Sequence, residues 1–146
     1  MGLICLQVFE YNDSKAKDHA LRLGVGMQLV NILRDLREDL DRNRIYIPLE
    51  EMAEFGYSES DFIEKKSNQQ LESLLLFQVL RAREYLGNVK ELVRYLPWRS
   101  RSCPKVLGGI YSKVLDKIQN NALAVMTDSV HLSKKEKVLT VMQAMI

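Results

Sequence analysis

The sequence predicts an all-α protein, organised as one helical bundle over residues 1–146. Only three prolines and seven glycines interrupt the 146 residues, and the apolar–polar alternation typical of strands is scarce. Hydrophobic residues make up 47% and charged residues 27% of the chain, which is typical of a folded globular domain. A formal net charge of +2 does not favour a strongly electrostatic nucleic-acid binder, so we expect no nucleic acid among its partners.

Capping signals divide the chain into helices. Ser, Asn and Asp cap helix N-termini, proline fits a first turn, and glycine or proline ends a helix. In the first half, the expected elements are a short helix at residues 2–10, a polar turn at 12–14, a long helix over about 15–40, and a short helix from Pro48 to near Gly56. In the second half, they are a short helix from a capping box at 58–61, a long helix over 67–97 capped by Ser67, a helix from Pro104 to near Thr127, and a last helix from a capping box at 133–136.

Signals for secretion or membrane insertion are lacking in the sequence. No apolar run approaches the roughly 18 residues of a membrane span, and the first residues do not resemble a signal peptide. Cys5 and Cys103 lie outside any metal-ligand spacing, as expected of idle thiols in a reducing compartment. We therefore expect a cytoplasmic protein.

Charge is unevenly distributed along the chain. Residues 1–80 hold nine basic and fourteen acidic side chains, whereas residues 81–146 hold twelve and five. A basic second half could attract phosphates or an anionic membrane surface. For most of these residues we favour the simpler interpretation of a solvated face of mixed charge.

A polar stripe on the long helix is the most informative feature. At about 100° per residue, five positions of residues 23–39 fall within a sector of roughly 80°, with apolar residues on both flanks. These positions are Gly24, Gln28, Asn31, Asp35 and Asp39. A helix that is apolar nearly all round is expected to be buried, so its polar stripe must face other polar groups.

The stripe alone supports two interpretations. One is a buried hydrogen-bond network in which Asp35 or Asp39 pairs with arginines of neighbouring helices. The other is a cavity that holds Mg²⁺, which takes oxygen ligands and keeps coordination positions open for substrate phosphates. Because acidic pairs four residues apart are common, the pattern by itself leaves both open.

Residues 28–48 carry a family resemblance. The pattern Gln28-x-x-Asn31-Ile32-x-Arg34-Asp35-x-x-Glu38-Asp39, followed by Arg44-x-Tyr46-Ile47-Pro48, resembles the second aspartate-rich region of the squalene/phytoene synthase family. Residues 109–115 resemble a later family helix whose tyrosine, here Tyr111, faces the diphosphates, and residues 130–137 resemble its C-terminal basic segment. The chain is most similar to the bacterial presqualene diphosphate or hydroxysqualene synthase branch, and it fits the C-terminal half of the family.

The resemblance implies a fold and an activity. The fold would be isoprenoid-synthase-like, all-α and partial, since the family's N-terminal helices are not matched. The enzyme would be a prenyltransferase that joins two prenyl diphosphates head to head with Mg²⁺, using farnesyl diphosphate in preference to geranylgeranyl diphosphate. Use of NADPH in a reductive second step, and the identity of the product, are not readable from the sequence.

The resemblance also assigns roles to individual residues. Asn31, Asp35 and Asp39 would be the Mg²⁺ ligands, with Asp35 and Asp39 as the catalytic carboxylates. The substrate-side contacts would be Gln28, Asn31, Arg34, Arg44, Tyr46 and Tyr111. The apolar cavity of such an enzyme could be lined by Leu71, Leu74, Leu75 and Gln78, although core packing is the interpretation we favour for each of them.

One expected part of the family site is not matched. The first aspartate-rich motif has no counterpart, and Glu50, Glu51 and Glu54 are expected to face solvent on their short helix. We therefore expect this chain alone to be catalytically incomplete. Self-association through apolar surface, and peripheral contact with a membrane, are further expectations.

Two other functions compete with the enzyme. The chain could be a helical interaction module that uses the fold without chemistry. It could also be an EF-hand-like calcium-binding protein, because Asp39, Asp41, Asn43 and Glu50 match ligand positions of that loop. Against the calcium loop, Arg44 stands where glycine is required and Pro48 lies inside the loop.

Overall fold

Helices make up the regular structure in the described part of the chain. The computed structural model describes residues 15–128 and 130–145, and no strand occurs within these ranges, which confirms the all-α prediction. The elements are α2 (Lys15–Arg34), α3 (Leu36–Asp41), α4 (Leu49–Glu54), α5 (Glu59–Ile63), α6 (Gln69–Leu86), α7 (Val89–Arg94), the 3-10 helix η1 (Trp98–Ser100), α8 (Ser102–Asn120), the 3-10 helix η2 (Ala122–Met126) and α9 (Lys134–Met145). The predicted helix at 2–10 and the turn at 12–14 lie outside the described residues.

Both predicted capping boxes are present. The Ser58 side chain accepts a hydrogen bond from the backbone of Asp61, whose carboxylate accepts one from the Ser58 backbone. Ser133 and Glu136 make the same reciprocal pair before α9, and these hydrogen bonds hold the pKa of Glu136 at about 2. The cap of α6 was misplaced by one residue, since Asn68, rather than Ser67, accepts from the backbone N–H of Leu71.

Each of the three long helices predicted is divided in two. The helix predicted over 15–40 is interrupted at Asp35, and the one predicted to end near Thr127 becomes α8 and η2. The helix predicted over 67–97 ends at Leu86, where Gly87 follows and the side-chain amide of Asn88 donates to the backbone carbonyl of Tyr85. A glycine followed by such a cap competes with helix continuation, and α7 starts again after it.

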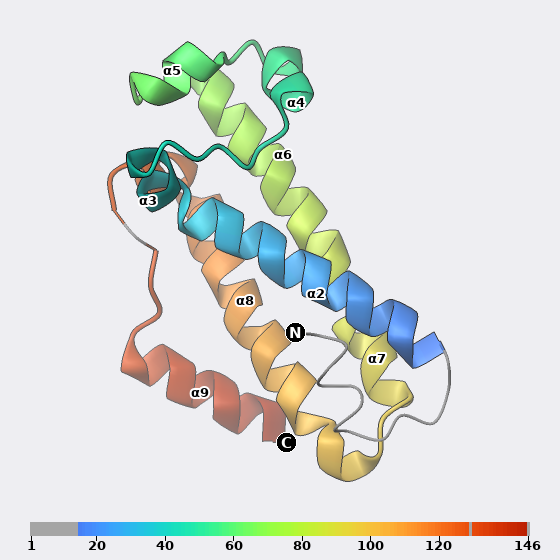
Figure 1. The fold of residues 1–146 in the computed structure, drawn as a ribbon. Coiled ribbons are helices and arrows are strands. Elements are labelled where there is room, and N and C mark those ends of the chain that lie inside the picture. The colour runs from blue at the N-terminus through green and yellow to red at the C-terminus, as the bar shows by residue number, and fades with distance from the viewer. Residues whose placement is uncertain (1–14, 129, 146) are drawn as a thin grey trace.

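The centre of the bundle is formed by α2, α6 and α8. Figure 1 shows α2 crossing α6, with α8 beside them and α9 lying across α8. Helices α4 and α5 cap the end of the bundle where α6 begins. The core side chains that these three helices contribute with at most 1% exposure include Val30, Leu33, Leu71, Leu74, Leu75, Val79, Leu115 and Ile118. The three leucines of α6 considered as cavity lining therefore pack in the core.

The crossing of α2 and α6 is closest at Gly26. A Cβ atom added to Gly26 would lie 2.9 Å from the backbone nitrogen of Leu86 and 3.0 Å from the Cβ of Tyr85. The backbone of α6 cannot move aside as a flexible side chain would, so only glycine fits at this position without a shift of the helices. Gly24, two residues earlier in the same helix, has no atom within 4 Å of an added Cβ.

None of the helices in the described part of the chain has both the length and the hydropathy needed to cross a lipid bilayer.

These two glycines give a matched test of the helix crossing. We expect Gly26→Ala to lower the free energy of unfolding by about 1–2 kcal/mol, because overpacking at the crossing exceeds the gain in helix propensity. Gly24→Ala should raise it by up to about 1 kcal/mol, because its methyl group meets open space. Chemical denaturation of both variants measures the difference, and equal effects would show that the crossing is not tightly packed.

Candidate functional site

The polar stripe spans the junction between α2 and α3. The backbone N–H of Asp35 donates to the carbonyl of Asn31, and that of Asp39 donates to the carbonyl of Asp35, both at 2.9 Å. Each such bond joins one turn to the next, so the three side chains lie on successive turns along one side of the helix. All three residues are partly buried, which places the stripe between the core and the solvent.

The side of α2 next to this stripe is open. Leu21 and Val25 are 43% and 46% exposed, and Gln28 is also exposed. The prediction that this helix is buried all round is therefore wrong for one face. The stripe lies at the border between the packed face of α2 and its open face.

Asp35 is held by its neighbour Arg34. The guanidinium donates from Nε and from one terminal nitrogen to the two carboxylate oxygens, at 2.7 and 2.6 Å. Adjacent residues of a regular helix do not face each other, and the pair coincides with a local departure of Asp35 to φ −98° and ψ 11°. The carboxylate is thus neutralised locally, and the hydrogen bond to it raises the pKa of Arg34 above its ordinary value.

Tyr111 of α8 belongs to the same electrostatic environment. Besides the dominant Asp35 hydrogen bond, the phenol of Tyr111 also contributes to the raised pKa of Arg34. Since α2 packs against α8, the structure brings together residues that are far apart in the sequence. The role predicted for Tyr111, a contact on the diphosphate side, stays a prediction.

Asn31 carries an unsatisfied acceptor. Its side-chain oxygen Oδ1 is buried and has no hydrogen-bond partner within the described structure. Leaving a buried amide oxygen unpaired costs about 1–3 kcal/mol, so such an atom calls for an explanation. The Asp39 carboxylate also forms no ion pair or side-chain hydrogen bond with any described residue. The Asn31 amide oxygen and the Asp39 carboxylate of the stripe therefore have no side-chain partner within the described structure.

Arg44 and Tyr46 lie in the segment that follows α3. The carbonyl of Asp39 accepts hydrogen bonds from the backbone N–H groups of Arg42 and Arg44, at 3.0 and 2.8 Å. Asn43 between them adopts a positive φ of 56°, which turns the chain sharply. Both predicted contact residues are exposed, so the structure ties the backbone of Arg44 to the stripe but does not bring either side chain into it.

Acidic side chains do not gather into a cluster in the described part of the chain. Within residues 15–128 and 130–145, no three His, Cys, Asp or Glu side chains come together as a metal-binding cluster. The EF-hand interpretation is not supported, since Asp39 and Asp41 lie in helix α3 rather than in a calcium loop, and Asp41 pairs with Lys65. Glu50 lies on the separate helix α4.

A polar network joins α4 and α6, and the sequence did not predict it. Glu51, predicted to face solvent, accepts hydrogen bonds from the amide of Gln78 and from Arg81, the latter at 2.6 Å. Gln78 is only 4% exposed, so it is held by this network and is not free to line a cavity. Arg81 also lies over the ring of Phe77, at 4.8 Å. Gln78 and Arg81 lie three residues apart on one face of α6, and this spacing was the sequence signal that could have indicated a shared partner.

Comparison with known proteins identifies the family. The family profile described as squalene/phytoene synthase matches residues 1–136. The chain belongs to the squalene/phytoene synthase family. This confirms the resemblance on which residues 28–48 were interpreted.

The relatives of this squalene/phytoene synthase chain are similar over most of its length. The 15-cis-phytoene synthase of Synechocystis sp. is 35% identical over 123 residues, which cover 84% of this chain and 36% of that protein. The chloroplastic phytoene synthase 2 of Oryza sativa is 36% identical over 133 residues, which cover 88% of this chain and 33% of that protein. The chain thus spans about a third of the length of the curated relatives it matches.

Solved structures share the fold. YisP from Bacillus subtilis superimposes with a TM-score of 0.77 at 27% identity, over 88% of this chain and 51% of that protein. A dehydrosqualene synthase in complex with a ligand gives a TM-score of 0.77 at 28% identity, over 86% and 44% of the two chains. Squalene synthase HpnC from Alicyclobacillus acidocaldarius gives 0.78 at 21% identity, over 82% and 45%, a likeness of fold alone. The predicted isoprenoid-synthase-like fold is therefore confirmed.

The network at Glu51 can be tested against its neighbour. We expect Glu51→Ala to lower the free energy of unfolding by about 1–3 kcal/mol, because it leaves the buried amide of Gln78 without its acceptor. Glu50→Ala on the same short helix should change it by less than about 0.5 kcal/mol, because Glu50 is exposed. Thermal and chemical denaturation measure both variants, and equal losses would argue against the network.

Proposed function

We propose that the chain binds a prenyl diphosphate together with Mg²⁺ along Asn31, Asp35 and Asp39, as part of a head-to-head condensation of two such diphosphates. The observation that carries this proposal is the buried, unpartnered oxygen of Asn31, which lies on one helical ladder with two carboxylates. Membership of the squalene/phytoene synthase family supports the reaction class. The proposal covers this chain as a part of the enzyme, because it spans about a third of its curated relatives.

The donor set fits Mg²⁺ in kind. Amide and carboxylate oxygens are ligands that this cation takes, and it usually keeps several positions for water and substrate phosphate. When bound, the cation would act as a Lewis acid that neutralises the leaving diphosphate. A carboxylate offers about four lone-pair sites, so Asp35 can keep both hydrogen bonds from Arg34 and still contribute an oxygen.

The remaining side chains would act on the diphosphate. The planar guanidinium of Arg34 keeps donors beyond those given to Asp35, and such a group recognises phosphate oxygens well. The hydroxyl of Tyr111 can donate a hydrogen bond on the α8 side. Gln28, on the open face of α2, would contact substrate as it enters, and Arg44 and Tyr46 would do so from the following segment. These roles remain predictions for each residue.

The chain length of the substrate is the finer part of the proposal. We propose farnesyl diphosphate in preference to geranylgeranyl diphosphate. The similar proteins include a dehydrosqualene synthase as well as phytoene synthases, so the experiment must offer both substrates. A cytoplasmic location is a further prediction, whereas the sequence does not indicate whether NADPH is used in a second step.

Binding should depend on the two carboxylates of the stripe. We expect Asp35→Ala and Asp39→Ala each to weaken Mg²⁺-dependent binding of farnesyl diphosphate at least tenfold, since loss of even an outer-sphere partner of a metal costs roughly 10–100-fold. Isothermal titration calorimetry with and without Mg²⁺ measures the change. Asp41→Ala is the matched control, because Asp41 lies in the same helix but pairs with Lys65. A folded chain that shows no metal-dependent binding would contradict the proposal.

Turnover is a separate expectation. We expect the isolated chain to form little or no hydrocarbon product from either diphosphate, because its described carboxylates supply one aspartate-bearing stripe and no second cluster. Product analysis after incubation with each substrate, Mg²⁺ and NADPH provides the measurement. Rapid formation of a squalene-type or phytoene-type product by the pure chain would show that one stripe is enough.

A helical interaction module is the second candidate. The observation that favours it is the open apolar surface of α2 at Leu21 and Val25. A chain that self-associates in light scattering, and binds no diphosphate in the titration above, would support this alternative over the enzyme.

A further inference from the structure

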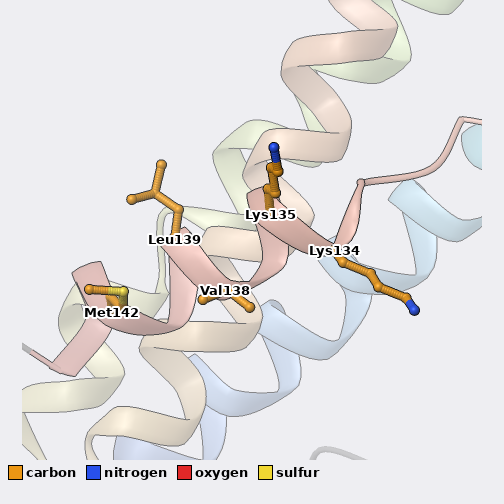
Figure 2. Close-up of a pocket in the computed structure, with 5 residues that line it drawn as sticks. All are labelled: Lys134, Lys135, Val138, Leu139 and Met142. Carbon is orange, nitrogen blue, oxygen red and sulfur yellow. The ribbon is translucent and has the colours of Figure 1, made fainter.

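Helix α9 presents apolar side chains to solvent. Val138, Leu139 and Met142 are between 51% and 59% exposed, and they line an open depression together with Lys134 and Lys135. Figure 2 shows these five side chains projecting from this one helix. We call this set of five residues the α9 outer face. An apolar strip on a surface helix is the reverse of the usual arrangement, in which such residues face the core.

The opposite side of α9 is firmly attached to α8. Thr140 is 3% exposed, and a Cβ added to Gly109 of α8 would lie 2.7 Å from its methyl carbon. The Glu136 carboxylate accepts a hydrogen bond from the Ser133 backbone at 2.7 Å and pairs with Lys117 of α8 at 3.0 Å. The helix is therefore oriented by its inner contacts, and the outer face cannot turn inward without breaking them.

Charge on the outer side of α9 has one sign. Glu136 carries the one carboxylate side chain of residues 130–145. This carboxylate accepts a hydrogen bond from the Ser133 backbone and forms an ion pair with Lys117. Lys134 and Lys135 belong to the outer face, Lys137 is also exposed, and none of the three forms an ion pair within the described structure. A cationic end followed by an apolar strip is complementary to a surface that is anionic outside and apolar beneath.

We propose that the α9 outer face docks on an anionic lipid surface, with Val138, Leu139 and Met142 entering the acyl boundary and Lys134 and Lys135 meeting the headgroups. This inference does not rest on the proposed catalytic function. A second copy of this chain would present lysines to lysines at this face, so charge disfavours it as the occupant. The helix would lie along the surface, since α9 is held against α8 through Glu136 and Thr140 and is too short to cross a bilayer.

Vesicle flotation of the full 146-residue chain tests the proposal. We expect binding to vesicles of phosphatidylcholine mixed with phosphatidylglycerol, weaker binding to phosphatidylcholine alone, and a decrease with salt. Lys134→Gln combined with Lys135→Gln should lower the partition coefficient at least tenfold, since each lysine near an anionic surface contributes roughly fivefold. Leu139→Gln combined with Met142→Gln should lower it to a similar degree.

Matched controls separate the α9 outer face from general stickiness. Leu80→Gln removes an equally exposed leucine from α6, and Lys90→Gln combined with Lys105→Gln removes the same charge elsewhere. Both controls should bind as the unmodified chain does, and circular dichroism confirms that all variants fold. Equal binding to neutral and anionic vesicles, or equal losses in controls and α9 variants, would overturn the proposal. The proposal would also be overturned if the chain does not bind vesicles but forms a dimer in sedimentation velocity, and if Leu139→Gln dissociates that dimer.

Discussion

The close crossing of α2 and α6 is the constraint on which the rest of the structure depends. Gly26 allows the two backbones to approach within the distance that a methyl group would occupy, and Val30 and Leu33 of the same helix are buried. This close approach sets which side of α2 faces α6. The stripe of Asn31, Asp35 and Asp39 must then lie at the edge of the packed face, where it meets solvent and α8. A stripe turned inward would have had to pair within the core.

Much of this arrangement could be predicted from local sequence. The capping boxes at Ser58 and Ser133 are correct because each closes hydrogen bonds over three residues and needs no distant partner. The shared side of the stripe is also correct, since helical periodicity alone places residues four apart together. The proposed role of the stripe as a Mg²⁺ and diphosphate site came from the family resemblance, because periodicity alone does not indicate a ligand.

The errors arise where distant segments meet. The break at Asp35 accompanies a pair with Arg34 that ordinary helical geometry does not allow, and no propensity signals it. Glu51 is charged and lies on a short helix, so its pairing with Gln78 and Arg81, 27 and 30 residues away, could be recognised only after α4 was placed on α6. The open face of α2 was unexpected for the same reason, because an apolar helix does not reveal which of its sides is covered.

The segment between α3 and α4 is fastened at both ends. At the start of the segment, the backbone carbonyl of Asp39 accepts hydrogen bonds from the backbone N–H groups of Arg42 and Arg44. At its end, the salt bridge between Glu51 and Arg81 holds helix α4 against α6. Attachment at both ends restricts the conformations that Arg44 and Tyr46 can adopt in the free protein. Less conformational entropy is then lost when an anion orders these side chains. The folding free energy of the contact between α4 and α6 thus offsets part of the entropic cost of ordering this segment.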